Sequence, residues 1–437
     1  MYRTIKKFFY FPLAYYFRFF AQIRLSIWKP KIIVVTGSSG KTTLLNLIES
    51  QLKDKAKYSH FANSSFGIPF DILGLRRKKL TLDEWFYLFV KAPLNVFKKF
   101  PKQKIYVVEA DCDRPSEGKF LASLLKPEIT LWVGMGIAHS LNFDKVVKDK
   151  KFFSVEQAIA YEFGYFLEES KSLAIVNRDS KLIVQQLKRS KASAETVTQN
   201  QLKSYNIFNN QTEFKIDGTA YKFNVLLPKE FFYSIQMIKI LLDYLKIEPD
   251  FTFSKFSLPH GRSSLFKGVK KTTIIDSSYN ATPDSMKSLL QMFDLYPSDK
   301  KWLVLGDMIE LGKEEKQEHE KLADVINSMK LEKIILIGPR LSKYTYPKLK
   351  KYIATPRRRR GSDLDSFEMD SRVETFLMPK DALGYLMQNL QEGETILFKG
   401  ARFLEGIIEH LLVSKKDVRK LCRRELIWQE RREKWGL

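Results

Sequence analysis

Residues 31–49 read KIIVVTGSSGKTTLLNLIE, and this stretch decides the fold of the first part of the chain. Its residues Ile32 to Val35 are apolar and β-branched, which predicts a buried strand. Glycines and small polar residues follow, and leucines and an isoleucine then recur at helical spacing. A strand, a glycine turn and a helix in this order bring several backbone N–H groups to a helix N-terminus, where the helix dipole also favours an anion. The sequence therefore predicts a phosphate-binding loop between this strand and this helix.

Two side chains give this loop the chemistry of a nucleotide site. Lys41 adds a positive charge that can reach terminal phosphates, and the Thr42 hydroxyl can ligate Mg²⁺. The loop lacks the full GxxxxGK[ST] pattern, because Val35 stands where the first glycine should be. An ordinary Gly-Ser turn before a helix is the alternative, but the strand before it and the Lys-Thr-Thr after it favour phosphate binding. The predicted phosphate-binding residues are Gly37, Ser38, Ser39, Gly40, Lys41, Thr42 and Thr43.

Length and composition indicate a soluble protein with several domains. The chain has 437 residues, of which 44% are hydrophobic and 28% charged, so two or three domains are expected. Cys112 and Cys422 are too few and too far apart for a disulfide framework or a zinc site. This cysteine usage is typical of a reducing cytoplasm.

The net charge of +24 is concentrated in three segments. Residues 1–30 carry six basic and no acidic side chains, residues 340–360 carry nine and none, and residues 414–437 carry nine and four. Together they account for +20 of the total. Such basic segments indicate an anionic membrane surface, nucleic acid or simple solubility. The chain has no aromatic-basic RNA module and no zinc pattern, so we do not expect nucleic-acid binding.

Residues 1–30 are rich in aromatic and basic side chains. The longest uncharged stretch, Phe8 to Phe17, is far shorter than the roughly 20 apolar residues that a spanning helix needs. No small-residue cleavage site follows, so a secretory signal is not expected. The composition fits a helix lying in a membrane interface, and it equally fits a helix packed on the neighbouring domain. We expect deletion of residues 1–28 to spare chemistry on a soluble substrate.

Two further strands add candidate ligands. The run KIYVV ends at Glu109, and a carboxylate at the carboxyl end of a strand beside a phosphate loop is well placed to hold Mg²⁺. His139 follows the strand-like run of residues 126–140, although a lone histidine is more often a structural hydrogen-bonding group. Strands that alternate with helices predict a parallel, doubly wound sheet. Residues 212–226 predict a β-hairpin that turns at Asp217-Gly218.

A second α/β unit begins near residue 255. Apolar runs within residues 272–286, 302–312, 333–338 and 394–402 predict its strands, and helical segments separate them. The polar, charged segment 355–372, which contains the basic run 357–360, is expected to be a mobile loop between these elements. The predicted organisation is an N-terminal segment (1–30), a first α/β domain (31–256), a second (257–413) and a basic helical tail (414–437).

Several blocks occur in an order that resembles one family. They are TGSSGKTT (36–43), VVEADCDRP (107–115), IIDSSYNATPDSM (274–286), LGDMIELG (305–312) and FKGAR (398–402). Over about residues 30–412 they resemble the Mur ligases, which are ATP-dependent enzymes that form amide bonds. The resemblance implies an α/β fold with a P-loop ATPase domain, built on a parallel central sheet, and a C-terminal Rossmann-like ligase domain.

The resemblance also implies roles for single residues of the first domain. Lys41 and the adjacent backbone would hold the β- and γ-phosphates of ATP. Thr42 and Glu109 would bind a first Mg²⁺, and Glu109 and His139 a second. Lys41, Glu109 and His139 are therefore candidate catalytic residues.

In the second domain, the resemblance implies that Arg262, Asp276 and Asn280 reach the nucleotide when the domains close. Lys399 would sit near the acceptor amine or the developing phosphate, as a fourth candidate catalytic residue. The implied reaction converts a carboxylate into an acyl phosphate, which an amine then attacks. The implied substrates are ATP, a peptidoglycan precursor peptide, and an amino acid or the dipeptide D-Ala-D-Ala.

Three features depart from the family pattern. Only about 30 residues precede the phosphate loop, so the domain that grips the UDP part of the substrate is not expected. The stretch 158–166 has no lysine where related ligases carry a carbamylated one, so that either Lys150 or Lys151 substitutes for it or the second metal is weakly held. Ser234 stands near the place of an asparagine that usually meets adenine.

Other functions therefore stay open: a P-loop NTPase that is not a ligase, or a nucleotide-binding protein that docks on a membrane or nucleic acid through its basic segments. We expect the protein in the cytoplasm, with peripheral contact at the inner face of the membrane through residues 1–30.

Overall fold

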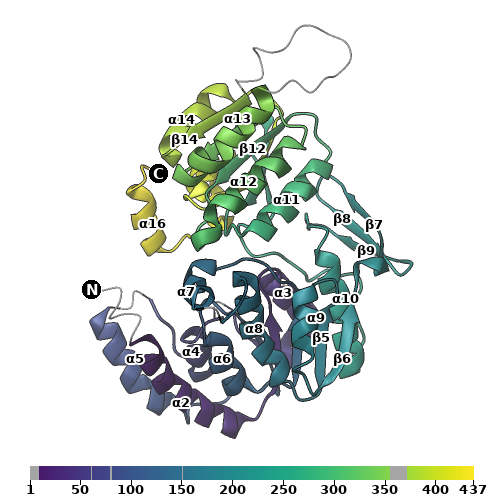
Figure 1. The fold of residues 1–437 in the computed structure, drawn as a ribbon, viewed down its shortest axis with the longest axis vertical. Coiled ribbons are helices and arrows are strands. Elements are labelled where there is room, and N and C mark those ends of the chain that lie inside the picture. Colours follow the sequence, from purple (N-terminus) through teal and green to yellow (C-terminus); the bar gives the residue numbers. More distant parts are fainter. Residues whose placement is uncertain (1–8, 61, 79–80, 150, 355–371) are drawn as a thin grey trace. The chain divides into compact units, whose positions relative to one another are not determined.

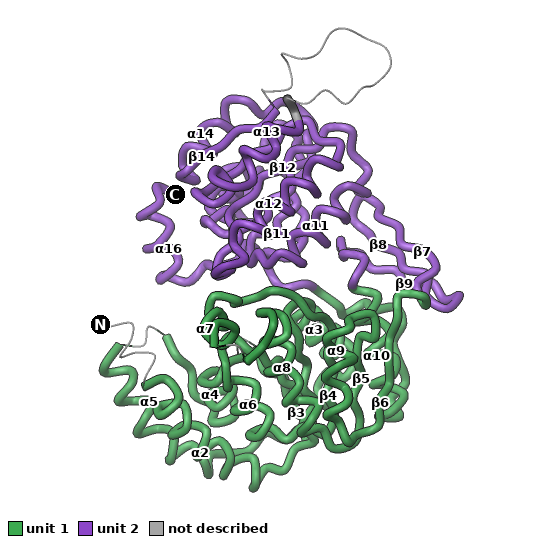
Figure 2. Tube along the Cα trace, in the orientation of Figure 1, with its two compact units in different colours: residues 1–201, 231–257 green, residues 202–230, 258–437 purple. Residues whose placement is uncertain are grey.

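The computed structural model describes residues 9–354 and 372–437, except residues 61, 79, 80 and 150. The basic run 357–360, and all of the predicted loop 355–372 but its last residue, lie outside the described residues. The chain divides into two compact units (Figure 2). Unit 1 comprises residues 1–201 and 231–257, and unit 2 comprises residues 202–230 and 258–437.

Unit 1 is built on a six-stranded sheet with the strand order β2-β3-β1-β4-β5-β6, and every pair in it is parallel. This confirms the predicted parallel central sheet. The strands are β1 (Lys31–Thr36), β2 (Ala56–Tyr58), β3 (Ile105–Ala110), β4 (Ile129–Trp132), β5 (Leu173–Asn177) and β6 (Ser193–Val197). All of β1 except Lys31 is buried, as its β-branched sequence predicts for a central strand.

Helices enclose this sheet (Figure 1). They are α2 (Tyr10–Trp28), α3 (Lys41–Leu52), α4 (Gly67–Leu73), α5 (Leu82–Asn95), α6 (Glu117–Leu125), α7 (Asp144–Lys148), α8 (Val155–Glu168), α9 (Lys181–Leu187) and α10 (Phe231–Leu245). Ile32 and Val34 of β1 share a core cluster with side chains from α2, α4, α6 and α8. Helix α3 packs against α10.

Helix α2 is an integral part of unit 1. Its side chains Ala14, Phe17 and Ala21 are fully buried in the core cluster. The alternative that the N-terminal helix packs on the neighbouring domain is thus confirmed. None of the helices in the described residues combines the length and the apolar character that a membrane-spanning helix needs.

Unit 2 contains a second six-stranded sheet with the order β10-β11-β15-β12-β13-β14, in which only β10 is antiparallel. Its strands are β10 (Ser264–Lys267), β11 (Thr273–Ser277), β12 (Lys301–Gly306), β13 (Lys333–Ile337), β14 (Val373–Phe376) and β15 (Thr395–Lys399). Its helices are α11 (Pro283–Leu295), α12 (Glu315–Asn327), α13 (Tyr346–Ala354), α14 (Pro379–Asn389), α15 (Leu404–Leu411) and α16 (Leu426–Glu433). The predicted Rossmann-like arrangement is confirmed.

A small antiparallel sheet groups with unit 2. It consists of β7 (Leu202–Ile207), β8 (Thr212–Ile216) and β9 (Thr219–Phe223), in that order. The pairing of β8 with β9 confirms the predicted hairpin and its turn at Asp217-Gly218. Strand β7 was not predicted, because only part of its sequence alternates between apolar and polar residues.

The C-terminal tail also packs on unit 2. Arg423 and Arg432 pair with the buried carboxylate of Glu405 in α15, and the thiol of Cys422 lies 3.5 Å from the Ser278 hydroxyl. Cys112 and Cys422 are both buried free thiols, as their separation in the sequence predicts.

Candidate nucleotide and metal site

The loop between β1 and α3 has a backbone that requires glycine at two positions. Gly37 (φ +128°) and Gly40 (φ +81°) both adopt backbone conformations that other residues rarely take. A Cβ on Gly37 would lie 2.5 Å from the carbonyl oxygen of Gly134. The same carbonyl accepts a hydrogen bond from the Ser38 N–H at 3.0 Å, and the loop after β4 therefore supports the phosphate loop.

Lys41, the first residue of α3, is buried inside this loop. Its Nζ donates to the Gly37 carbonyl oxygen at 2.6 Å and pairs with Asp111 Oδ2 at 2.8 Å. Burial by itself lowers the pKa of Lys41, but the charges of Asp111 and Glu109 outweigh it, and the pKa is raised overall. Lys41 therefore stays charged at the N-terminus of α3, where an anion is favoured.

The remaining predicted loop residues lie on the same turn. A Cβ on Gly134 would lie 3.3 Å from the Ser39 hydroxyl. Thr42 and Thr43 belong to the first turn of α3, and the N-cap residue Gly40 has no side chain that could cap it. The predicted strand, glycine turn and helix are thus confirmed, whereas nucleotide binding by these residues stays a prediction.

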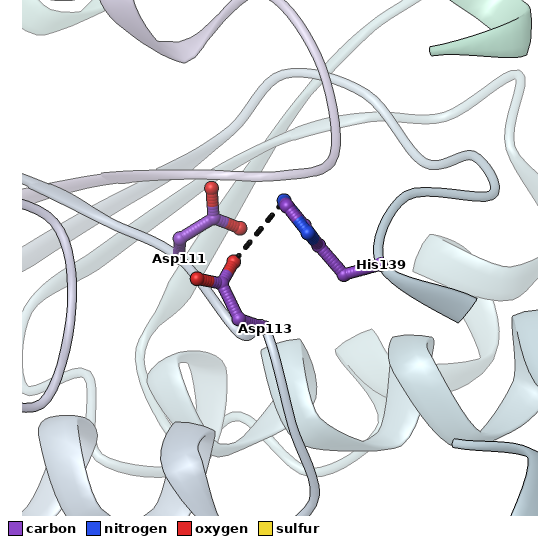
Figure 3. Close-up of side chains that lie close together, drawn as sticks. All are labelled: Asp111, Asp113 and His139. Carbon is purple, nitrogen blue, oxygen red and sulfur yellow. Dashed lines mark ion pairs between the residues drawn. The ribbon is translucent and has the colours of Figure 1, made fainter. Parts of the chain in front are cut away.

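Asp111, Asp113 and His139 form a compact cluster beside the loop (Figure 3). One ligand atom from each lies within 4.8 Å of the others, and His139 Nε2 is 3.3 Å from Asp113 Oδ1. Sheet register explains the proximity, because Thr36 at the end of β1 lies opposite Ala110 of β3 and Trp132 of β4. The segments that follow these three strands therefore meet at one edge of the sheet.

The electrostatics of this cluster favour a cation. Burial and the neighbouring charge of Asp111 raise the pKa of Asp113 to about 6, although His139 lowers it. Two carboxylate oxygens suit Mg²⁺ or Mn²⁺, and an imidazole nitrogen is a further possible ligand. The side chains present thus fit a divalent metal ion.

A buried carboxylate behind the cluster fixes its backbone. Glu117 accepts hydrogen bonds from the N–H groups of Ser65 at 2.9 Å and Asp113 at 3.0 Å. It also accepts from the Ser65 hydroxyl at 2.5 Å and from the Tyr10 hydroxyl of α2 at 3.4 Å. The position of Asp113 therefore depends on three segments of unit 1, one of which is α2.

Glu162 of α8 is a second carboxylate that accepts hydrogen bonds from backbone N–H groups. It lies in the stretch 158–166, where the resemblance implies a lysine, and burial raises its pKa. Its carboxylate accepts from the N–H groups of Ser116 at 2.7 Å and Gly118 at 3.0 Å, at the start of α6. Glu162 thus fixes the backbone of the segment that follows Asp113 in the chain.

The cluster differs from the predicted ligand set of Thr42, Glu109 and His139. His139 belongs to both sets, and the cluster adds Asp111 and Asp113, whereas metal binding by Thr42 and Glu109 stays a prediction. Glu109 is the last residue but one of β3 and is buried, and its N–H donates to the Ser59 hydroxyl at 3.0 Å. The Asp-x-Asp pattern directly after a buried strand was a signal that could have identified the additional carboxylates.

Unit 2 brings together the four residues that the resemblance singled out there. Strand β11 pairs with β15, so that Asp276 lies opposite Phe398 and Ser277 opposite Lys399. Lys399 Nζ donates to the carbonyl oxygen of Asn280 at 2.5 Å. Burial and the nearby charge of Arg262 lower the pKa of Lys399 to about 7, against the opposing effect of Asp276.

Asp276 is fully buried beside Lys399. Its Oδ1 accepts from the Ser278 N–H at 2.9 Å, and its Oδ2 has no hydrogen-bond partner among the described residues. Burial raises its pKa. The Arg262 guanidinium lies 4.7 Å from the centre of the Tyr279 ring. An unsatisfied buried oxygen beside Lys399 is suited to receive a donor from a ligand.

Asp307 is a further buried carboxylate in unit 2 that the sequence did not single out. It accepts hydrogen bonds from Arg402 at 2.5 and 3.0 Å, and from the N–H groups of Arg340 and Leu341 at 3.1 and 3.0 Å. It therefore braces the FKGAR segment that carries Lys399.

Comparison with known families matches most of the chain. The family described as "Mur ligase middle domain" matches residues 35–238, and the family described as "Mur ligase, glutamate ligase domain" matches residues 261–402. The first range contains Lys41 and the Asp111, Asp113 and His139 cluster, and the second contains Arg262, Asp276, Asn280 and Lys399.

Individual relatives agree with this assignment. The chain is 27% identical over 395 residues to the UDP-N-acetylmuramoyl-tripeptide–D-alanyl-D-alanine ligase of Bacillus subtilis, covering 88% of this chain and 76% of that protein. The fold is similar to the crystal structure of MurF ligase from Thermotoga maritima in complex with ADP, with a TM-score of 0.69 and 19% identity over 93% of this chain and 84% of that one. MurF from Acinetobacter baumannii gives a TM-score of 0.67 and 17% identity over 89% and 78%. The chain therefore belongs to the Mur ligase family.

Proposed function

We propose that this protein is an ATP-dependent ligase that adds D-alanyl-D-alanine to the peptide of a UDP-N-acetylmuramoyl-tripeptide. The proposal takes its substrates from the relative in Bacillus subtilis, whose name states them. The observation that carries it is the buried, charged Lys41 in a glycine loop beside the Asp111, Asp113 and His139 cluster. Unit 2 adds Lys399 with a pKa of about 7.

The chemistry of amide formation requires these groups. A carboxylate has no leaving group, and ATP is the substrate that supplies one by transferring its terminal phosphoryl group. Lys41 and the N–H groups at the start of α3 bind the negative charge of that group. Mg²⁺, when bound by Asp111, Asp113 and His139, supplies further positive charge to the phosphates.

In this proposal, residues of unit 2 bind the nucleotide and act on the acceptor amine. Arg262, Asp276 and Asn280 bind the nucleotide, and the open Oδ2 of Asp276 accepts a donor from it. Lys399 can hold or release a proton near neutral pH, because its pKa is about 7. It therefore either takes a proton from the ammonium group of the acceptor, so that the neutral amine can attack, or, when charged, stabilises the phosphate that leaves.

We also propose a cytoplasmic location with peripheral contact at the inner face of the membrane through residues 1–30. ATP and the nucleotide-linked precursor are cytoplasmic substrates in this scheme. Within the described part of the segment, Tyr15, Phe19 and Ile27 of α2 are exposed although its other face is buried.

The decisive experiment measures phosphate release from ATP with Mg²⁺, UDP-MurNAc-tripeptide and D-Ala-D-Ala. We expect release only when both the tripeptide and the dipeptide are present, together with the amide product by mass spectrometry. The matched control is Lys41→Met, which keeps the length of the side chain and removes its charge.

Two other results would contradict the proposal. Phosphate release that does not depend on D-Ala-D-Ala would indicate an NTPase that is not a ligase. ATP binding without any phosphate release in the presence of both substrates would indicate a nucleotide-binding protein that has lost the reaction.

A further inference from the structure

Helix α5 is apolar on both of its faces. Trp85, Leu88 and Phe89 face the core of unit 1. On the opposite side, exposed apolar residues follow one another at four-residue spacing: Leu82 (91% exposed), Phe86 (73%), Val90 (45%) and Leu94 (62%). At about 100° per residue they span an arc of about 120°, which is a continuous stripe along the helix. A helix that only covered a core would carry polar side chains on this outer arc.

Helix α2 lies beside α5 (Figure 1) and has exposed apolar side chains of its own. The Tyr16 hydroxyl donates to the Phe89 carbonyl oxygen at 2.9 Å. The Arg24 guanidinium donates to the carbonyl oxygens of Asn95 at 2.6 Å and Val96 at 3.0 Å, which fixes the end of α5 to α2. We name the exposed apolar side chains of the pair the α2–α5 surface: Tyr15, Phe19, Ile27, Leu82, Phe86, Tyr87, Val90, Leu94 and Phe97.

The chain on either side of α5 is strongly basic. Residues 76–104 contain nine lysines and arginines and only two acidic residues, Asp83 and Glu84. Arg76, Arg77 and Lys78 precede the helix, Lys98 and Lys99 follow it, and all five are exposed. Exposed apolar side chains flanked by cations suit an anionic lipid surface. The apolar side chains can insert among the acyl chains, and the cations are attracted to the anionic headgroups.

We propose that the α2–α5 surface docks on an anionic lipid bilayer, with α5 lying in the interface. The inference deepens the peripheral membrane contact proposed above and moves its centre from residues 1–30 to α5. It does not depend on the ligase activity. A second copy of the chain would also cover apolar side chains, but rows of exposed cations at both ends of α5 would repel the same rows of that copy.

The test is sedimentation of the full chain with vesicles. One set contains only phosphatidylcholine, and the other contains about one third phosphatidylglycerol. We expect wild-type protein to bind the anionic vesicles, with binding that weakens as salt rises. The triple variant Phe86→Gln/Val90→Gln/Leu94→Gln should bind at least about tenfold more weakly.

The matched control is Phe153→Gln, because Phe153 is 98% exposed but precedes α8, outside the α2–α5 surface. It should bind as wild type does. Equal binding of the triple variant and wild type, or no wild-type binding to anionic vesicles, would overturn the proposal. Concentration-dependent dimers of wild type that the triple variant does not form would overturn it in favour of self-association.

Ligase turnover of the same proteins, measured without lipid, separates this inference from the proposed function. The triple variant should keep wild-type turnover, since its three side chains are exposed and belong to neither the Asp111, Asp113 and His139 cluster nor the Lys399 site. If wild type shows no ligase turnover, the proposed function fails, and the vesicle result still stands.

Discussion

Lys399 gives the clearest quantitative prediction, because it is a buried lysine with a pKa of about 7. Its ordinary pKa in an unfolded chain is about 10.4. Between these two values the unfolded chain holds a proton that the folded chain has released. The free energy of unfolding therefore rises with pH across this window. Below about pH 7 both states are protonated, and the folded state bears the full cost of a buried charge.

The size of the effect follows from the two pKa values. From pH 7 to pH 9 the unfolded lysine stays protonated, while folded Lys399 changes from half to almost fully neutral. Integration of the difference in bound protons gives about 2 kcal/mol of added stability. For a unit of this size, that corresponds to a rise in Tm of about 4–8 °C.

The assay is thermal unfolding of wild type and Lys399→Met at pH 7 and pH 9. Methionine keeps the volume of the side chain and removes the titrating amine. Other titrating groups are common to both proteins, so the difference between them isolates Lys399. The Tm of wild type relative to the variant should rise by that amount between the two pH values. A difference that does not change with pH would show that Lys399 keeps its ordinary pKa, and the role proposed for it near neutral pH would fail.

Three further substitutions test unit 1. Lys41→Met should lower kcat by at least about 100-fold and keep the far-UV circular dichroism of wild type; turnover within a few-fold of wild type would contradict the site. Asp113→Asn should weaken Mn²⁺ binding, followed by isothermal titration, by about tenfold or more; unchanged affinity would remove Asp113 from the ligands. Glu117→Gln, which replaces an acceptor for the Asp113 N–H without touching the metal, should weaken the same binding by about 10–100-fold. An unaltered Mn²⁺ titration would mean that Glu117 supports only the fold.

The sequence predicted those features that local patterns encode. The phosphate loop follows from a β-branched run, two glycines and a helical repeat, all within residues 31–49. The parallel sheet follows from strands that alternate with helices. Both are short-range signals, and the structure reproduces both.

Features that depend on the order of strands in the sheet could not be predicted from local sequence patterns. Asp276 and Lys399 become neighbours because β11 pairs with β15, although 123 positions separate the two residues in the chain. Asp111 and Asp113 were not predicted as ligands because Glu109, at the expected end of the strand, already matched the pattern of a carboxylate beside a phosphate loop. The burial of α2 was left open, since an aromatic helix suits a protein core and a membrane interface equally well.

The hydrogen bond from Tyr10 to Glu117 has a consequence for experimental design. A chain truncated before Lys29 loses this hydroxyl, the Arg24 contacts that hold the end of α5, and the buried aromatic ring of Phe17. These contacts argue against the expectation that residues 1–28 can be deleted without effect on chemistry, which stays a prediction. A truncated protein would combine altered lipid affinity with a displaced Asp113, whereas substitutions of exposed side chains on the outer faces of α2 and α5 change the lipid-facing surface alone.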